Sequence, residues 1–238
     1  MHLLTTSPIV VLTGAGISAE SGLATFRGAD GLWENHRIDK VASPQGFAQQ
    51  PELVHRFYNQ RRAQLQAVAP NAAHLALAEL ERAWPGEFLL VTQNVDDLHD
   101  RAGNLKLIHL HGELARVRCT RCRRVFPWTG DTSQAIPCPA CGRRPALRPH
   151  IVWFGERPFE MARIQSALAR CGLFVAIGTS GTVYPAAGFV ACVGAGAATL
   201  ELNLEPSLVA SGFAGHRQGP ATERVPELVR ELLAGLGA

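Results

Sequence analysis

Residues 10–22 read VVLTGAGISAESG, which places Gly14, Ala15 and Gly16 directly after an apolar run and before a helix-like stretch. A glycine-rich turn between a strand and a helix is the context in which such a pattern predicts dinucleotide binding. Glycines let the backbone approach a pyrophosphate, and the first amides of a helix donate hydrogen bonds to it. A tight strand-to-helix turn without a ligand is the alternative. The stretch therefore predicts an α/β fold with a candidate nucleotide site.

Further apolar runs along the chain have the length and β-branched content of buried parallel strands. They cover residues 9–13, 88–92, 105–110, 173–177 and 199–204, and helix-like stretches such as 72–82 and 159–170 lie between several of them. This alternation predicts a Rossmann-type doubly wound parallel sheet. Such sheets bind ligands where their strands end, and here these ends read TGAG, TQNVDD, HLHGE, GTSGT and NLEP. We expect one shared cleft at these ends.

Two stretches interrupt the alternation of strand and helix. Residues 31–70 have a helical pattern, and residues 116–149 are rich in Pro, Cys and Arg. We interpret both as insertions that form a smaller lobe beside a core of residues 1–30, 71–115 and 150–238. The expectation is a single catalytic domain over residues 1–238.

The composition is that of an ordinary globular protein, with 47% hydrophobic and 18% charged residues. No apolar run reaches the roughly 18 residues of a membrane helix, so no membrane partner is expected. The net charge of +3 gives no strong signal for nucleic acid. Because no Lys or Arg precedes the first apolar run, we interpret that run as a buried strand and expect a cytoplasmic protein. The sequence leaves the oligomeric state open, and a monomer is compatible with it.

The cysteines point to a metal site. Cys119-x-x-Cys122 and Cys138-x-x-Cys141 are separated by fifteen residues, which matches the spacing of a zinc site with four thiolate ligands. Because four thiolates fill the coordination shell, we predict one structural Zn²⁺ rather than a catalytic one. The remaining Cys171 and Cys192 lie in apolar sequence and are expected in the core.

His111 is the candidate general base. It follows the expected strand at residues 105–110 and precedes Gly112, which places it at the mouth of the expected cleft. An imidazole there can accept a proton near neutral pH. A hydrogen-bonded structural histidine is the alternative, and the sequence alone does not separate His111 from His109, two residues earlier.

Taken together, these motifs resemble the sirtuin family, in order and over nearly the whole chain. They are GAGISAESGLATFRG (14–28), TQNVDDLH (92–99), HLHGE (109–113), the two cysteine pairs, VWFGE (152–156), GTS (178–180) and NLEP (203–206). The chain is similar in particular to the bacterial branch that removes acetyl and succinyl groups. It departs from many members at Ala24-Thr25, where they carry Pro-Asp before Phe-Arg-Gly.

The resemblance implies an NAD-dependent protein-lysine deacylase that consumes NAD and acts on acyl-lysine proteins. It implies His111 and Asn94 as catalytic residues, with His111 as the base. The implied NAD-binding residues are Gly14, Ala15, Gly16, Phe26, Arg27, Gln93, Asn94, Asp96, Gly178, Thr179, Ser180, Asn203, Leu204, Glu205 and Ala221. The implied products are nicotinamide, O-acyl-ADP-ribose and the deacylated lysine. Protein ADP-ribosyl transfer at the same NAD site is the alternative.

For the substrate, the resemblance implies that VWFGE binds the peptide as an added strand, with residues 181–184 opposite. The substrate residues of this segment are Val152, Phe154, Gly155 and Glu156. Tyr58 and Arg61 lie three positions apart, so on a helix they can face one pocket. Without the resemblance, Tyr58 and Arg61 are explained by an amphipathic helix with a solvated arginine. With the family, Tyr-x-x-Arg and the small Ala42 imply a pocket for succinyl- and malonyl-lysine as well as acetyl-lysine.

Two further functions compete with this reading. A dehydrogenase fits the glycine turn, but the insertion at residue 31 stands where a second strand should end in a ribose-binding acid. A zinc-ribbon nucleic-acid binder is supported by the arginines around the first cysteine pair, which are Arg116, Arg118, Arg121, Arg123 and Arg124. A solvated basic face explains these arginines equally well, and such a face can attract acidic partners.

Overall fold

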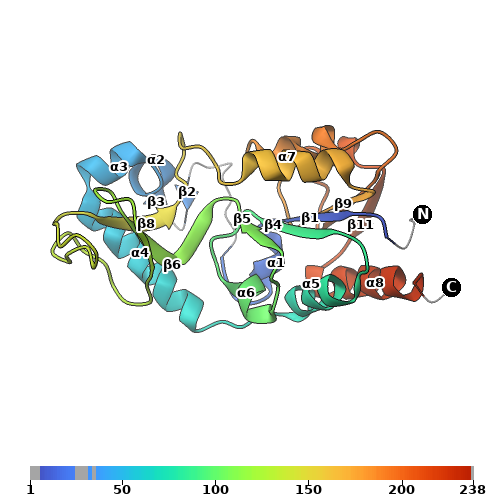
Figure 1. Ribbon diagram of the computed structural model, residues 1–238, viewed down its shortest axis with the longest axis horizontal. Helices are drawn as coiled ribbons and strands as arrows, with labels where there is room; N and C mark the ends of the chain where they lie inside the picture. Colours follow the sequence, from blue (N-terminus) through green and yellow to red (C-terminus); the bar gives the residue numbers. More distant parts are fainter. Residues whose placement is uncertain (1–5, 25–31, 34–35, 237–238) are drawn as a thin grey trace.

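A parallel sheet forms the centre of the computed structural model, which describes residues 6–24, 32–33 and 36–236 (Figure 1). Within these residues the sheet has six strands in the order β11-β10-β9-β1-β4-β5. The strands are β1 (Ile9–Thr13), β4 (Phe88–Thr92), β5 (Leu107–His109), β9 (Leu173–Ile177), β10 (Ala198–Asn203) and β11 (Gly215–Gln218). Because β4 and β9 lie on opposite sides of β1, the chain winds outward from β1 in both directions. The doubly wound parallel sheet is confirmed.

The predicted strand bounds agree best with the observed ones where the strand is fully buried. Strands β1, β4 and β9 have the predicted bounds, and every residue in them is buried. Strand β5 is shorter than the expected residues 105–110, and β10 is shifted by one residue from the expected 199–204. The pattern does not predict β11, because its sequence GHRQ contains no apolar run.

Alternate side chains of β1 pack against helices on the two faces of the sheet. Ile9 and Val11 pack with α5 (Ala72–Ala83) and α8 (Ala221–Ala234). Val10 and Leu12 pack with α7 (Met161–Arg170) and the 3₁₀ helix η2 (Ala186–Cys192). Figure 1 shows α7 above the sheet, with α5 and α8 below it. Burial on both faces is the reason that β1 reads as an unbroken apolar run.

The small lobe lies at the left of Figure 1 and combines helices with a separate sheet. The elements are α2 (Ile38–Val41), α3 (Pro44–Gln49), α4 (Pro51–Gln66), and the antiparallel strands β6 (Gly112–Cys119), β7 (Val125–Pro127) and β8 (Leu147–Ile151). A short pair, β2 (Leu32–Trp33) and β3 (His36–Arg37), precedes them. Phe57 and Tyr58 of α4 share an apolar cluster with Leu114 and Trp153, which joins the helices to the sheet.

Two helix starts show how local sequence sets the fold. Helix α3 begins after Ser43, whose hydroxyl accepts a hydrogen bond from the Gly46 amide, and Pro44 occupies its first turn. Helix α5 begins after Asn71, whose side chain accepts from the amides of Ala73 and His74. Both are the side-chain caps expected at helix N-termini. The remaining short helices are α1 (Gly16–Ala19), α6 (Leu98–Ala102) and η3 (Ala210–Gly212).

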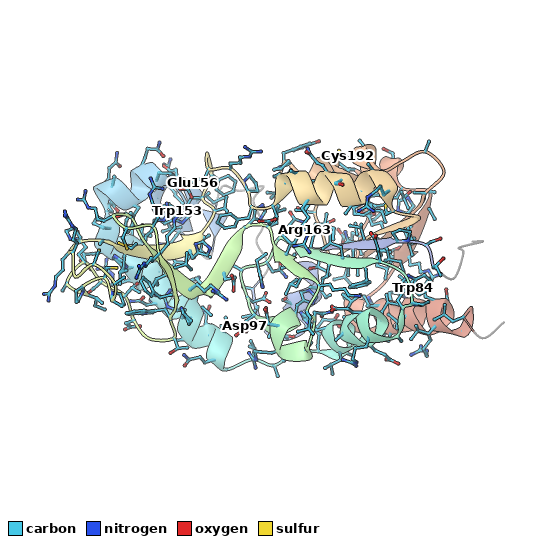
Figure 2. All side chains as sticks on the ribbon, in the orientation of Figure 1. Trp84, Asp97, Trp153, Glu156, Arg163 and Cys192 are labelled. Atoms are coloured by element: carbon cyan, nitrogen blue, oxygen red, sulfur yellow. The ribbon has the colours of Figure 1, made fainter. Side chains whose placement is uncertain are left out.

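The two cysteines outside the paired motifs differ in burial. Cys171 is buried beside α7, as expected. The expectation that Cys192 lies in the core is wrong: it is exposed at the end of η2, because that helix buries Ala186, Ala187 and Phe189 instead (Figure 2).

Among the described residues, no helix combines the length and the apolar character that crossing a membrane requires.

Candidate functional site

Three glycines pack together where β1 and β9 end. The Gly14 amide donates to the Ile177 carbonyl (2.9 Å) and the Gly16 amide donates to the Gly178 carbonyl (2.9 Å). A Cβ atom on Gly14 would lie 2.7 Å from the Gly178 carbonyl oxygen, and one on Gly16 would lie 2.6 Å from the Gly178 Cα. Gly178 also has φ = +61°, which favours glycine. Glycine is therefore required on both loops, at the switch point where doubly wound sheets bind ligands.

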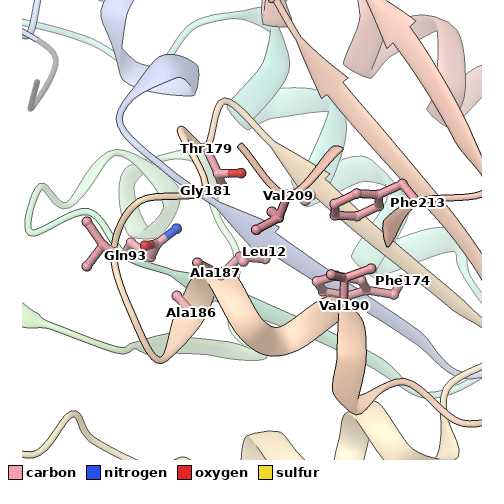
Figure 3. A pocket seen from close by; sticks show the side chains of 12 residues that line it. Leu12, Gln93, Phe174, Thr179, Gly181, Ala186, Ala187, Val190, Val209 and Phe213 are labelled. Carbon is pink, nitrogen blue, oxygen red and sulfur yellow. The ribbon is translucent and has the colours of Figure 1, made fainter. Parts of the chain in front are cut away.

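A pocket opens beside this glycine contact (Figure 3). Its lining includes Leu12 of β1, Gln93 after β4, Thr179 and Gly181 after β9, and Ala186 of η2. Gln93 and Thr179, both expected to bind a nucleotide, thus lie at one pocket although they follow different strands. The pocket thus joins two of the five predicted strand ends, those of β4 and β9.

Asn94 and Asp96 are buried under the glycine turn and meet at Ser18. Asn94 Nδ2 donates to the Gly14 carbonyl (3.0 Å) and to Ser18 Oγ (3.1 Å), and Ser18 Oγ donates to Asp96 Oδ2 (3.0 Å). Burial raises the pKa of Asp96, although hydrogen bonds from Leu98 and Ser18 oppose this shift. Both Nδ2 protons of Asn94 are donated to groups of the protein itself. Its Oδ1 therefore remains as the acceptor of this side chain. Ser18 has no predicted role, although it follows the glycines in the same motif.

Two buried histidines extend this polar network below the site. His99 Nε2 lies 3.1 Å from Thr13 Oγ1, and Thr13 Oγ1 donates to Thr92 Oγ1 (2.9 Å). His74 Nε2 lies 3.4 Å from Ser18 Oγ. Burial lowers the pKa of His74 to about 4 and also lowers the pKa of His99. Both rings are therefore neutral near pH 7 and act as hydrogen-bonding groups of the interior.

His111 has a defined tautomer. Its Nδ1 lies 3.1 Å from the main-chain carbonyl of Gln93, which can only accept, so Nδ1 carries the proton and Nε2 keeps its lone pair. Burial lowers the pKa of His111, and the hydrogen bond to Gln93 only partly offsets this shift. The imidazole is thus neutral near pH 7, with Nε2 able to accept a proton.

His109 has a different environment from His111. Its Nε2 lies 3.0 Å from Asp100 Oδ2, on α6. Burial lowers the pKa of His109, but the hydrogen bond to Asp100 and the charge of Asp100 together raise it by more. The net shift of the pKa is therefore upward. The two histidines that the sequence leaves unresolved therefore have separate partners and opposite pKa shifts.

The end of β10 contributes a second edge of the site. Asn203 Nδ2 donates to the Thr179 carbonyl (2.6 Å), which ties the loop after β9 to β10. Leu204 and Glu205 follow as exposed residues, and Ala221 is buried at the first position of α8. These residues, expected to bind NAD, lie in segments that leave the neighbouring strands β10 and β11.

Four predicted nucleotide-binding residues remain. Ala15 is the N-cap residue of α1, and Ser180 Oγ lies 2.7 Å from Thr182 Oγ1. Phe26 and Arg27 lie outside the described residues.

Tyr58 and Arg61 are both buried on α4, with relative exposures of 0% and 8%. The Tyr58 hydroxyl oxygen accepts from Trp153 Nε1 (2.9 Å), and burial strongly raises the pKa of Tyr58. The Arg61 guanidinium stacks on the Phe57 ring, 4.0 Å from its centroid, and Nη1 donates to the Phe57 carbonyl (3.1 Å). Arg61 is therefore not the solvated arginine of an amphipathic helix. Ala42 is buried in the same apolar cluster as Tyr58.

The VWFGE segment, residues 152–156, connects the small lobe to the core (Figure 2 labels Trp153 and Glu156). The Val152 amide donates to the His111 carbonyl (2.8 Å), and the half-exposed Phe154 donates through its amide to the Ala42 carbonyl (3.0 Å). Gly155 has φ = +87° and closes the turn. One backbone segment thus contacts both the candidate base and the small residue of the candidate acyl pocket.

Glu156 anchors this turn. Its carboxylate accepts from Arg148 Nη1 (2.7 Å), from Arg118 Nη2 (2.9 Å) and from the Trp153 amide (2.9 Å). Burial alone would raise the pKa of Glu156, but the Arg148 hydrogen bond and the nearby charges lower it. The carboxylate therefore remains ionised and holds the turn in place.

The four paired cysteines converge on one point. Their Sγ atoms all lie within 4.8 Å of one another, with Cys119–Cys141 at 3.8 Å and Cys122–Cys138 at 3.7 Å. A tetrahedral Zn²⁺ with Zn–S bonds of about 2.3 Å requires S–S edges of about 3.8 Å, whereas a disulfide requires about 2.05 Å. The amides of Arg121 and Cys122 also lie 3.4 Å from Cys119 Sγ, as donors to a thiolate. The site fits one structural zinc ion.

Comparison with known proteins identifies close relatives of this arrangement. The model of the Sir2 family matches residues 14–185. The chain is 58% identical over 228 residues to an NAD-dependent protein deacylase of Pasteurella multocida (strain Pm70), covering 94% of this chain and 97% of the relative. The structure superposes on a Sir2 homologue–NAD complex with a TM-score of 0.87 and 41% identity, covering 98% of this chain and 92% of the other. A mutant Sir2 homologue in complex with 2′-O-acetyl ADP ribose matches with a TM-score of 0.87 and 40% identity, covering 98% and 95%.

Proposed function

The chain belongs to the Sir2 family, and on that premise we propose that it removes acetyl, succinyl and malonyl groups from protein lysines with NAD as co-substrate. The products are nicotinamide, O-acyl-ADP-ribose and the deacylated lysine. The domain is the single catalytic unit described from the sequence, with a nucleotide-binding core and a zinc-bearing small lobe.

The observation that carries this proposal is the environment of His111. Its Nδ1 proton is held by the Gln93 carbonyl, so Nε2 is the basic atom, and Gln93 itself lines the pocket at the strand ends. NAD supplies the ADP-ribose that receives the acyl group. In that reaction His111 accepts a proton from a ribose hydroxyl, a contribution typically worth about 10² to 10⁴ in rate.

Two of the residues that would hold NAD, Gln93 and Thr179, line this pocket, and the glycine loops lie at the ends of the same sheet. The packed loops at Gly14, Gly16 and Gly178 bring backbone to the switch point without side chains in the way. Asn94 is oriented by the Gly14 carbonyl and Ser18, so its Oδ1 is fixed as an acceptor. This fixed amide is the basis for assigning Asn94 a catalytic role beside His111.

A pH profile tests the base directly. Because His111 must be neutral to accept a proton and burial lowers its pKa from 6.5, kcat/KM should stay high at neutral pH. It should fall only as the pH drops through an apparent pKa below 6.5. We expect this result from kcat/KM measured on an acetyl-lysine peptide between about pH 5 and pH 8. His109→Gln should keep the same acid limb, and a limb with an apparent pKa above 6.5 would argue against His111.

The acyl preference rests on the burial of Tyr58 and Arg61 on α4 and on the apolar cluster that Tyr58 shares with Ala42. A buried guanidinium can bind the terminal carboxylate of a succinyl or malonyl group in a bidentate manner, and the Tyr58 phenol can add a hydrogen bond. Trp153 positions that phenol through its indole N–H. An acetyl group has no carboxylate, so it needs space in the acyl pocket but not the positive charge of Arg61.

Replacement of Arg61 tests this acyl preference. A charge-assisted hydrogen bond is worth roughly 1.5 to 3 kcal/mol, so Arg61→Met should lower kcat/KM on a succinyl-lysine peptide by about 10- to 100-fold. The same variant should lose much less on the matched acetyl-lysine peptide. Arg56→Met, an exposed arginine on the same helix, is the control and should behave as the unmodified protein. Equal losses on both peptides would mean that Arg61 supports the fold instead of binding the carboxylate.

Protein ADP-ribosyl transfer is the second candidate, because it would use the same NAD site. The deacylase is favoured by the VWFGE turn, which Glu156, Arg148 and Arg118 hold rigidly beside His111. Such a turn suits a peptide that binds as an added strand, with its acyl-lysine directed to the base.

A further inference from the structure

The zinc module carries a concentration of arginines, most of which have no role in the deacylation site. Between residues 116 and 149 the chain has eight arginines, no lysine and a single acidic residue, Asp131. Three of these arginines are paired: Arg116 with Glu113, and both Arg118 and Arg148 with Glu156.

The other five arginines are exposed and surround the four-cysteine cluster. They are Arg121, Arg123, Arg124, Arg143 and Arg144, which we call the arginine patch. Among the described residues, none of these five takes part in an ion pair. The patch is compact, because both cysteine pairs that carry it share one ligand cluster whose sulfur atoms lie within 4.8 Å of one another.

The arginine patch lies at a definable distance from His111. Strand β6 begins at Gly112, the residue after His111, and ends at Cys119, a zinc ligand. At about 3.3 Å per residue, this eight-residue strand spans about 26 Å. An extended peptide has the same rise per residue. A segment about eight or more residues away from an acyl-lysine bound at His111 can therefore reach the patch.

We propose that the arginine patch binds an acidic segment of the protein substrate, located about eight or more residues from the acyl-lysine. This inference rests on the proposed function in placing the acyl-lysine at His111. It defines the substrate class as acyl-lysine proteins in which an acidic segment lies at that separation. Charge complementarity, together with the lack of ion pairs between the patch and the part of the chain that the structure describes, identifies an acidic partner.

Two other roles for the patch fit the structure less well. Nucleic acid would call for an extended basic stripe with aromatic rings available for stacking. Here Trp128 donates its indole N–H to the Asp131 carbonyl, and the patch is confined to the cysteine turns. The arginines could instead offset the charge of the zinc cluster, where four thiolates and one Zn²⁺ carry a net charge of −2. Exposed guanidinium groups in water do this weakly, because solvent screens them.

The test compares acetyl-lysine peptides of equal length on the zinc-loaded protein. One peptide carries a block of glutamates about ten residues from the acetyl-lysine, the second has glutamines in that block, and the third has the glutamates directly beside the acetyl-lysine. Versions with the block on either side cover both chain directions. The patch variant is Arg121→Gln/Arg123→Gln/Arg143→Gln/Arg144→Gln. The control variant, with equal charge loss elsewhere, is Arg56→Gln/Arg82→Gln/Arg163→Gln/Arg230→Gln.

We expect the distant glutamate block to lower KM by about 5- to 30-fold relative to glutamine at low salt, with kcat unchanged. The effect should shrink as salt is added and disappear in the patch variant, but persist in the control variant. The adjacent block should not reproduce it. Fluorescence anisotropy of the labelled peptides should give the same order of affinities, so this readout tests the patch even if no peptide is deacylated.

Three results would overturn the proposal. The first is equal KM values and equal affinities for the distant glutamate and glutamine peptides. The second is loss of zinc from the patch variant together with a fall in turnover of the glutamine peptide, which would assign the arginines to the zinc site. The third is salt-dependent binding of a single-stranded oligonucleotide that the patch variant loses, with no preference for acidic peptides. Absence of turnover with intact, patch-dependent binding would count against the proposed function alone.

Discussion

Replacing His111 with alanine is expected to abolish deacylation while NAD binding remains. The variant removes the basic Nε2 atom, and loss of a general base typically costs about 10² to 10⁴ in rate. The glycine loops and the Asn94–Ser18–Asp96 network do not depend on the imidazole, so the nucleotide site should persist. Nicotinamide release and deacylated peptide should be measured together with NAD affinity by titration calorimetry.

The matched control for this experiment is His109→Ala. His109 interacts with Asp100 on α6 and not with Gln93, so its loss should lower the melting temperature more than the turnover. Near-normal turnover in His111→Ala would show that another group accepts the proton. Loss of NAD binding together with activity would show that His111 supports the pocket.

Removing zinc is expected to destroy activity although the metal takes no part in the chemistry. The apolar cluster of the zinc module is small and includes two of the ligands themselves, Cys119 and Cys138. Structural zinc contributes about 10 to 16 kcal/mol of apparent binding free energy in small peptides, more than such a cluster can replace. We expect one zinc per chain by elemental analysis, and unfolding of the module after chelation or in Cys138→Ser.

The loss should spread from the zinc module to the acyl pocket through α4. Thr132 belongs to the zinc module, and its Oγ1 lies 2.8 Å from His55 Nδ1. The Thr132 amide donates to Asn59 Oδ1 (2.9 Å), and the Thr132 hydroxyl accepts from Arg62 Nη2 (3.1 Å). These contacts come from the helix that also carries Tyr58. Chelation should therefore lower the thermal stability of the small lobe and abolish turnover of both acetyl and succinyl peptides.

The matched control for the zinc experiment is Cys192→Ser. Cys192 is an exposed cysteine outside the cluster, so this variant should keep both its zinc and its activity. Purified protein that contains no zinc and yet deacylates normally would contradict the assignment.

The parts of the fold that the sequence predicts are those in which burial alone decides the pattern. Strand β1 is buried on both faces and reads as an unbroken apolar run. Strand β11 has no such signal, because GHRQ is a partly exposed edge that depends on pairing with β10. The strands of the small lobe are likewise irregular in pattern, since they are organised by the cysteine cluster and by the Glu156 ion pairs.

The site follows the same division. The spacing of the cysteines predicts a four-ligand cluster, because it is set by local turns, and the sulfur atoms do converge. The sequence does not distinguish His111 from His109, because their difference arises from partners on other segments, Gln93 and Asp100. The role of Ser18 as the link between Asn94 and Asp96 also depends on contacts distant in sequence.

The most direct test of the central claim is the product balance of a single reaction. The zinc-loaded protein is mixed with NAD and an acetyl-lysine or succinyl-lysine peptide, and all products are quantified by liquid chromatography and mass spectrometry. We expect equal amounts of nicotinamide, O-acyl-ADP-ribose and deacylated peptide for both acyl groups. Nicotinamide released without deacylated peptide, together with ADP-ribose attached to protein, would contradict it.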